Sequence, residues 1–481
     1  MNVIWKPQPR QALFMSRPEY EAFYGGSAGG GKSDALICEA LRQVHIPYYK
    51  GLILRKTYPQ LEELIDKSLR YYPSAYPRAK YNVSTHTWTF PSGAKILFRS
   101  LQHSKNKTDF QGQAYDFIAF DELTHFTYDE YSYLFSRNRP NGAGTRVYIR
   151  STGNPSGIGH GWVKERFITA SKPMTPIKQT VRWYNPDGSM QEVENYRIFV
   201  PSTVWDNPAL LANDPMYISR LASMPEAERN ALLYGDWNSF SGQVFTEWRD
   251  NPDHYLDRVG THVIAPFRIP KDWKIWCGLD WGYARPYSIG YYAVDYDGRL
   301  YRIAEIYGCN GTPNTGVKEE PTAVALKMKE LEQTDPNLKG RQILRVGDPA
   351  IWQEDGRGHS IGSLFEKERI YFDLGDHARL SGKMQCHYRL TMDEEGLPMF
   401  YVFNTCKNFI RTIPNLVYDE THVEDVDTDG EDHAYDEWRY ICMANTISPA
   451  IPQKKIIRPY NPLDDDFDTY NYDRYEWWRN N

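Results

Sequence analysis

The first half of the chain alternates short apolar runs with stretches of helical periodicity. Apolar runs at 51–55, 117–120 and 146–150 predict buried strands, and the period of 59–71 predicts a helix. Residues 87–98 form two short β-prone runs around a Pro-Ser-Gly turn and predict a hairpin. Because strands and helices are interleaved, the pattern predicts an α/β layer fold with a mainly parallel sheet.

The second half follows a different order of elements. Apolar runs predict three strands at 274–279, 287–294 and 299–307, the last two joined by an Asp-Gly hairpin turn. A helix, a strand at 343–347, a helix near 361–369 and a strand at 370–374 come next. Helices near 379–390 and 406–416 follow, and a last helix begins at Asp432. This order resembles that of the ribonuclease H-like fold.

Length and composition limit the class of protein. At about 150 residues per domain, 481 residues suggest two to four domains. With 41% hydrophobic and 25% charged residues, and without an apolar run of about 18 residues, the sequence predicts a soluble globular protein with no membrane contact. Six scattered cysteines without a C-x-x-C pair argue against a zinc site and a disulfide framework.

Charge divides unevenly between the two halves. Residues 1–240 hold 28 Lys and Arg against 22 Asp and Glu, whereas 241–481 hold 28 against 40. This balance excludes a uniformly basic shell for nucleic acid. An acidic second half would use metal ions to approach a polyanion.

A phosphate-binding loop occupies residues 26–33, which read Gly-Ser-Ala-Gly-Gly-Gly-Lys-Ser and fit G-x-x-x-x-G-K-[ST]. An apolar segment precedes the loop and a predicted helix, 33–45, follows it. The glycines let backbone N–H groups surround a β-phosphate, Lys32 reaches the β- and γ-phosphates, and Ser33 ligates Mg²⁺. The residues predicted to bind nucleotide here are Gly26, Ser27, Gly29, Gly30, Gly31, Lys32 and Ser33.

Two acids follow the predicted strand at 117–120. Asp121 is expected to hold the Mg²⁺ shell, and Glu122 to polarise the attacking water. Further residues of the first half are candidates for contact with the nucleotide. Asn154, in the Ser-Thr-Gly-Asn-Pro segment 151–155 that is expected to follow a strand, would sense the γ-phosphate, although a plain turn fits as well.

Three arginines and one glutamine complete the candidates of the first half. Arg137 and Arg139 both fit an arginine finger, acting in cis or in trans, and equally fit a solvated basic face. Arg55, just past a strand, has the same two interpretations. Gln11 is a weak candidate for contact with adenine.

Three aspartates mark the second half. Asp280 ends its first strand, Asp348 ends its fourth, and Asp436 lies on the last helix, so all three are expected at one edge of the sheet. Carboxylates held together repel one another unless divalent cations neutralise them. Two Mg²⁺ or Mn²⁺ ions held there would support phosphodiester cleavage. Asp432 lies one helical turn before Asp436. His433 would ligate metal or carry a proton, although a surface histidine at the start of a helix fits equally well.

These features predict the domain organisation. A predicted helix at 217–234 closes the first half, and the Gly-, Ser- and Asn-rich segment 235–242 begins a linker. The expected domains are a P-loop ATPase domain (1–240), a linker (241–265), a ribonuclease H-like nuclease domain (266–450) and an acidic, aromatic C-terminal tail (451–481).

The ordered motifs resemble those of the large terminase subunit of tailed bacteriophages. The likeness rests on the phosphate loop, on the first-half segments 54–57, 117–122, 151–155 and Gly235-Asp236-Trp237, and on the second-half segments Asp280-Trp281-Gly282, Gly347-Asp348-Pro349 and 432–440. One departure concerns Glu437-Trp438, where members often have Ala-Leu. It leaves the acid assignment intact but not the packing of that helix.

The resemblance implies an ASCE-type ATPase that pumps double-stranded viral DNA through a portal protein into an empty capsid. It also implies a metal-dependent endonuclease that cuts concatemeric DNA, with ATP and Mg²⁺ as cofactors and Mn²⁺ as an alternative at the nuclease site. The implied partners are a small terminase subunit and further copies of the chain in a ring. The implied location is the host cytoplasm, transiently on the procapsid and not in the mature virion. A helicase–nuclease and a regulatory P-loop NTPase remain alternatives.

Overall fold

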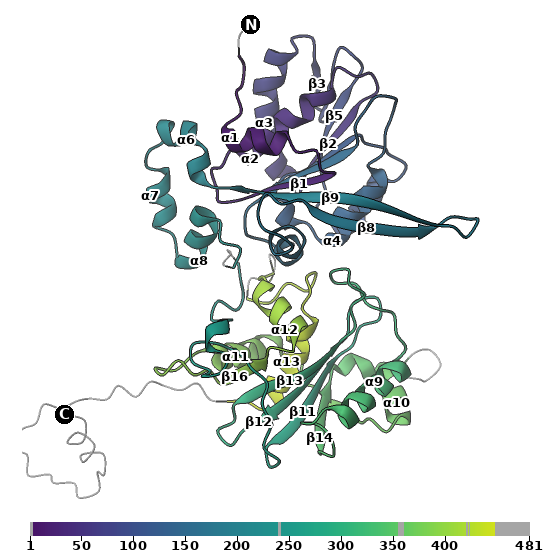
Figure 1. Cartoon of the computed structure of the whole chain (residues 1–481), viewed down its shortest axis with the longest axis vertical. Coiled ribbons are helices and arrows are strands. Elements are labelled where there is room, and N and C mark those ends of the chain that lie inside the picture. Colours follow the sequence, from purple (N-terminus) through teal and green to yellow (C-terminus); the bar gives the residue numbers. More distant parts are fainter. Residues whose placement is uncertain (1–2, 239–241, 355–359, 420–421, 423, 448–481) are drawn as a thin grey trace, which may run out of the picture. The chain divides into compact units, whose positions relative to one another are not determined.

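Each half of the chain carries its own sheet in the computed structural model (Figure 1). The structure describes residues 3–238, 242–354, 360–419, 422 and 424–447. The predicted tail at 451–481 lies outside the described residues, as does the start of the predicted linker, 239–241.

The first sheet has the order β3-β4-β5-β2-β6-β7-β1-β9-β8 within the described residues. Its six central strands, from β5 to β9, run parallel, and the strands at both ends are antiparallel. The strands are β1 (Glu21–Gly26), β2 (Lys50–Arg55), β3 (Lys80–Asn82), β4 (Thr87–Thr89), β5 (Lys95–Ser100), β6 (Phe117–Phe120), β7 (Tyr148–Gly153), β8 (Ile177–Tyr184) and β9 (Met190–Ser202). The predicted mainly parallel sheet is confirmed.

The apolar runs identify the central strands because both faces of a parallel sheet are covered. Every residue of β1, β6 and β7 is buried. The sequence does not identify β8 and β9, because their outer part is exposed on both faces and contains no apolar run. Figure 1 shows this hairpin extending beyond the other strands, while the buried end of β9 pairs with β1.

Helices cover the first sheet, and the sequence predicted three helical stretches there, at 33–45, 59–71 and 217–234. The helices of the structure are α1 (Pro9–Met15), α2 (Lys32–Glu39), α3 (Tyr58–Ala75), α4 (Tyr128–Tyr133), α5 (His160–Val163), α6 (Pro208–Asn213), α7 (Tyr217–Ala222) and α8 (Glu226–Arg229). The single helix predicted over 217–234 is wrong: it divides into α7, α8 and a π-helical turn, because Pro225 cannot continue α7. The strand predicted at 146–150 ends only at Gly153, so Ser151 and Thr152 lie within β7.

The second sheet has the order β10-β16-β13-β12-β11-β14-β15 within the described residues. Its strands are β10 (Val263–Ile264), β11 (Lys274–Asp280), β12 (Ser288–Val294), β13 (Leu300–Tyr307), β14 (Ile343–Gly347), β15 (Asp373–Leu374) and β16 (Phe400–Phe403). The antiparallel hairpin β12–β13 and the parallel pair β11–β14 confirm the predicted order. The strand predicted at 370–374 is limited to β15 in the structure. The sequence did not predict β10 or β16.

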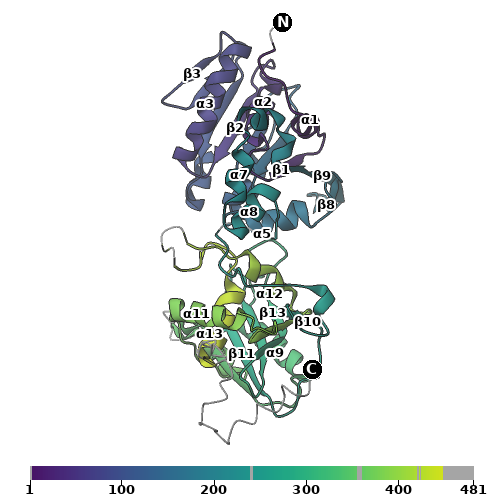
Figure 2. The ribbon, with the colours of Figure 1, turned by 90° about the vertical axis from the view of Figure 1, so that its left-hand side faces the viewer.

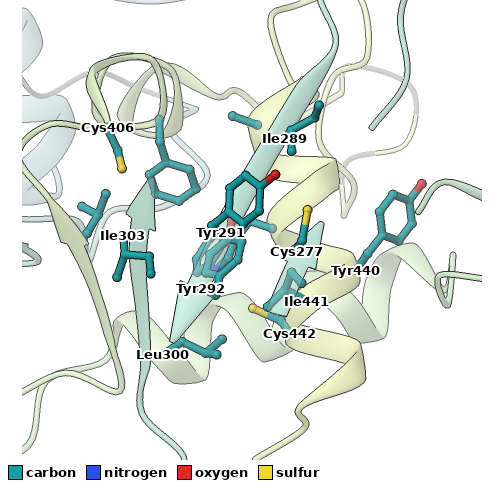
Figure 3. Packing of buried hydrophobic residues seen from close by; sticks show 14 of the residues in the cluster. Cys277, Ile289, Tyr291, Tyr292, Leu300, Ile303, Cys406, Tyr440, Ile441 and Cys442 are labelled. Atoms are coloured by element: carbon teal, nitrogen blue, oxygen red, sulfur yellow. The ribbon is translucent and has the colours of Figure 1, made fainter. Parts of the chain in front are cut away.

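Helices lie on both faces of this second sheet. They are α9 (Pro321–Thr334), α10 (Ile361–Lys367), α11 (Arg379–Leu390), α12 (Lys407–Thr412) and α13 (His433–Ala444). Figures 1 and 2 show α11 and α13 together on one face and α9 on the other. Figure 3 shows part of the core that results, in which Ile441 and Cys442 of α13 pack with strand residues such as Tyr292.

Part of the segment predicted as a linker is packed in the second core. Val244, Phe245 and Trp248 are buried there, and Gln243 pairs with Val417 in a β-bridge. β10 also belongs to the second sheet. Among the described residues, no helix combines the length and the apolar character that a membrane crossing needs.

Candidate functional sites

The phosphate loop connects β1 to α2 at the carboxyl edge of the first sheet. Gly26, Gly29 and Gly31 have positive φ angles, which L side chains rarely adopt. A Cβ atom on Gly26 would lie 2.1 Å from the Ser202 carbonyl oxygen of β9. The glycines are therefore required both by the turn and by the approach of β9.

Lys32 begins α2 and is buried. Its Nζ donates a hydrogen bond to the Ser27 carbonyl oxygen at 2.5 Å. Burial lowers its pKa to about 8, against the opposing charges of Glu122 and Asp121. An ammonium group held inside the loop is placed to neutralise phosphate.

Asp121 follows β6 and meets the loop as predicted. Ser33 Oγ donates to its two carboxylate oxygens at 3.3 and 3.2 Å, and Thr152 Oγ1 also donates to it. Arg55 forms a buried ion pair with it, with Nε 2.7 Å and Nη2 2.6 Å from Oδ2. Burial opposes ionisation, but the charge of Arg55 and the hydrogen bonds of Thr152 and Arg55 hold the pKa of Asp121 below its usual value.

Glu122 lies next to Asp121 in a left-handed conformation, with φ at 52°. Its carboxylate accepts hydrogen bonds from the Asn154 backbone N–H and side-chain amide, both at 3.1 Å. Thus the residue predicted to sense the γ-phosphate touches the residue predicted to activate water. A strained conformation at such a position is common where geometry serves function.

A cavity of about 270 Å³ unites these groups. Residues 28–34, Arg55, Glu63, Lys67, Glu122, Asn154, Asn207 and Leu210 line it. Lys67 and Asn207 are two lining residues that the sequence did not predict. Asn207 donates to the Gly29 carbonyl oxygen at 2.8 Å, and Lys67 lies 2.9 Å from Glu63. The sequence around a lysine on an amphipathic helix does not show that the lysine lines a site, because this depends on which strand the helix packs beside.

Two of the weaker candidates have other contacts. The Gln11 side chain donates to the Gly31 carbonyl oxygen at 2.7 Å and accepts from the Gln8 N–H, so it supports the phosphate loop. Arg137 donates to the Tyr133 hydroxyl at 3.0 Å, and Arg139 is exposed. Neither arginine lines the cavity. Contact of Gln11 with adenine stays a prediction.

The three predicted acids gather at one edge of the second sheet. Asp280 ends β11, and Asp348 follows β14, whose last residue pairs with Leu279. The Asp348 N–H donates to the Leu279 carbonyl oxygen at 2.9 Å, which places the two aspartates on adjacent strands. Burial raises the pKa of Asp280 well above its usual value, and the charges of Asp436 and Asp348 add to this.

His433 and Asp432 lie beside the same acids. His433 Nδ1 is 3.2 Å from Asp280 Oδ2, and its Nε2 is 2.9 Å from Asn314 Oδ1. Burial raises the pKa of Asp432, as does the charge of Asp436. Asp436 receives a hydrogen bond from Arg439 Nε at 3.0 Å.

A divalent cation suits this donor set. Buried carboxylates that raise one another's pKa need compensating charge, and hard oxygen ligands favour Mg²⁺ or Mn²⁺. As the side chains stand, no group of three His, Cys, Asp or Glu in the described part of the chain has the arrangement of a metal site. Side-chain rotation would have to bring the carboxylates together around a cation.

The structure combines an α/β domain that carries a phosphate loop with a second α/β domain that carries three aspartates at one edge of its sheet. Residues 23–249 match the family model described as "Terminase large subunit, T4likevirus-type, N-terminal". The match covers just under half of the chain and includes the phosphate loop, Asp121 and Glu122. No curated protein matches this chain.

Solved structures of large terminases are similar over most of the chain. The large terminase of a thermophilic bacteriophage is 16% identical, with a TM-score of 0.39, over 92% of this chain and 100% of that one. The HK97 bacteriophage large terminase is 10% identical, with a TM-score of 0.46, over 92% and 95%. The P22 large terminase nuclease domain is 19% identical, with a TM-score of 0.31, over 42% of this chain and 93% of that one.

Proposed function

We propose that this chain hydrolyses ATP at the phosphate loop to move double-stranded viral DNA, and cuts that DNA at the acidic edge of the second sheet. The observation that carries the proposal is the presence of both sites in one chain. The loop meets Asp121 and Glu122 in the first domain, and three aspartates converge in the second. A regulatory P-loop NTPase would need neither Glu122 nor the second-half acids.

In the first domain, each residue has a distinct task in hydrolysis. Backbone N–H groups of the loop and the Lys32 ammonium would hold the phosphates. Ser33 and Asp121 supply the oxygen ligands that Mg²⁺ prefers. Glu122, oriented by Asn154, would accept the proton of the attacking water. Arg55 already pairs with Asp121, so Arg55 and a bound Mg²⁺ would both interact with this carboxylate.

In the second domain, Asp280, Asp348 and Asp436 would hold divalent cations, with His433 and Asp432 in support. Such cations stabilise the charge that develops on the phosphodiester during cleavage. The three aspartates would determine where the cations lie relative to the phosphodiester. His433 bridges Asp280 and Asn314, so it would orient Asp280 and carry a proton at Nδ1.

The proposed setting is the host cytoplasm during virus assembly, where copies of the chain form a ring on a portal protein. A small terminase subunit would present the DNA. Adding purified capsids that carry their portal should stimulate the DNA-dependent ATPase of the full chain. ATP-dependent separation of duplex strands, without capsid stimulation, would instead support a helicase–nuclease.

The paired acids of the first domain should fail in different ways. Glu122→Gln should bind ATP with near-normal affinity yet lose at least about 100-fold in turnover, because the amide keeps the size but cannot accept a proton. Asp121→Asn should instead weaken Mg²⁺-dependent nucleotide binding. Equilibrium binding and steady-state hydrolysis separate the two effects. Full turnover in the Gln variant would remove Glu122 from catalysis.

We also propose that Arg137 or Arg139 acts in the nucleotide site of a neighbouring subunit. The corresponding Arg→Ala variant should bind ATP normally and lose about 1000-fold in hydrolysis. Mixing it with Lys32→Ala should restore part of the activity, since each lesion then affects a different half of a shared site. Arg70→Ala, at an exposed position on α3, is the control. If assembled mixtures recover nothing, the arginine acts in cis or lies in solvent.

A further inference from the structure

A buried ion pair lies under the acidic centre of the second domain. Arg302 of β13 and Glu437 of α13 are both fully buried, and Arg302 Nη1 lies 2.5 Å from Glu437 Oε2. Ser288 Oγ donates to the same oxygen at 3.3 Å, and Arg302 also donates to the Tyr292 hydroxyl. The packing of Glu437, which the sequence left open, is therefore defined by its pairing with Arg302.

Two strands make room for this pair. Gly278 of β11 and Gly290 of β12 are paired across the sheet. A Cβ on either glycine would lie 2.5 Å from Glu437 Oε1, and one on Gly290 would also lie 2.2 Å from Arg302 Nη1. The Glu437 side chain therefore fits against the sheet only because both of these strand positions are glycine.

This contact fixes the rotation of α13 about its axis. Asp436 precedes Glu437 by one residue, which is about 100° around a helix. With Glu437 held beneath the sheet by Arg302, Asp436 is directed to the edge where Asp280 and Asp348 end their strands. An apolar pair would fill the same space without a directed bond, and it would avoid the cost of burying two charges.

We propose that Arg302 and Glu437 are positioning residues for the nuclease site, which set the rotation of α13 and thereby the place of Asp436. The inference rests on the proposed nuclease function. Outer contacts that orient metal ligands typically change metal affinity or activity by about 10–100-fold. The pair should therefore control how much metal the enzyme requires.

The test uses the full-length chain with the double variant Arg302→Met, Glu437→Leu, which removes both charges and keeps an apolar core. Nicking of supercoiled plasmid is measured against Mn²⁺ concentration, together with ATPase activity and the melting temperature. We expect an unchanged ATPase and a folded protein. Half-maximal nicking should require about 10–100-fold more Mn²⁺. The single variant Arg302→Lys, which keeps the positive charge, should show a smaller increase in the required Mn²⁺ concentration. It replaces the double variant in the test if the double variant does not fold.

The matched control is Arg345→Met, Glu332→Leu. Arg345 of β14 and Glu332 of α9 form a partly buried ion pair 2.8 Å long. Arg345 pairs with Cys277, whereas Gly278 faces α13, so alternation along the strand places this pair on the opposite face. The control variant should reach half-maximal nicking at the same Mn²⁺ concentration as the parent.

The outcomes separate the two levels of the proposal. A double variant that nicks with the parent's Mn²⁺ dependence would show that the pair only stabilises the core and would overturn the inference. An equal shift in the control would also overturn it. A folded parent chain that nicks with neither Mn²⁺ nor Mg²⁺ would overturn the nuclease function itself.

Discussion

Replacing Lys32 by alanine should reduce ATP hydrolysis by at least about 100-fold and leave metal-dependent nicking of naked DNA at the parent's rate. The loss follows because the buried ammonium of Lys32 is the cation that the loop itself supplies to the phosphates. Nicking survives because the three aspartates belong to a different sheet. Hydrolysis and plasmid nicking are measured on the same preparation.

The control for this substitution is Lys95→Ala, which removes an exposed lysine at the start of β5. It should hydrolyse ATP as the parent does. A Lys32→Ala protein that binds and hydrolyses ATP normally would show that residues 26–33 are only a glycine-rich turn. Loss of nicking along with ATPase, in a folded protein, would contradict the independence of the two sites.

Substituting any one of Asp280, Asp348 and Asp436 by alanine should reduce DNA cleavage by more than about 100-fold. This exceeds the effect of losing an outer contact, because each would supply negative charge directly to the same cations. The losses should be strongly non-additive, since a half-built site cannot hold both metals. ATPase activity should survive in each variant. Cleavage assays in Mg²⁺ and in Mn²⁺ provide the measurement.

Several comparisons sharpen this second prediction. Mn²⁺ should rescue weakened variants better than Mg²⁺, which demands stricter octahedral geometry. His433→Ala should lose less, as a supporting residue, and Asp297→Asn, in the exposed β12–β13 turn, should lose nothing. If Asp432→Ala is inactive while Asp436→Ala cuts normally, the ligand on α13 is Asp432. Parental cleavage in all three single variants would place the nuclease site elsewhere.

Local sequence patterns identified the phosphate loop and the acids because each depends on neighbours in the chain. The glycines, Lys32 and Ser33 need a strand before them and a helix after them, and the structure contains both. Asp121 follows the buried strand β6, Asp280 ends the strand β11, and Asp348 follows the half-buried strand β14, so each lies at the end of a strand that its own local sequence predicts. Helix boundaries were less certain, as the break at Pro225 shows.

Only the tertiary structure decided which charged residues are buried and with whom they pair. A sequence gives Arg55, Lys67, Arg302 and Glu437 the same polar character as surface residues, since burial depends on segments far away in the chain. The Arg55–Asp121 pair joins β2 to β6, and the Arg302–Glu437 pair joins β13 to α13. A buried charge is stable only beside its partner. The chain therefore determines the chemistry of each site locally, while long-range packing determines its geometry.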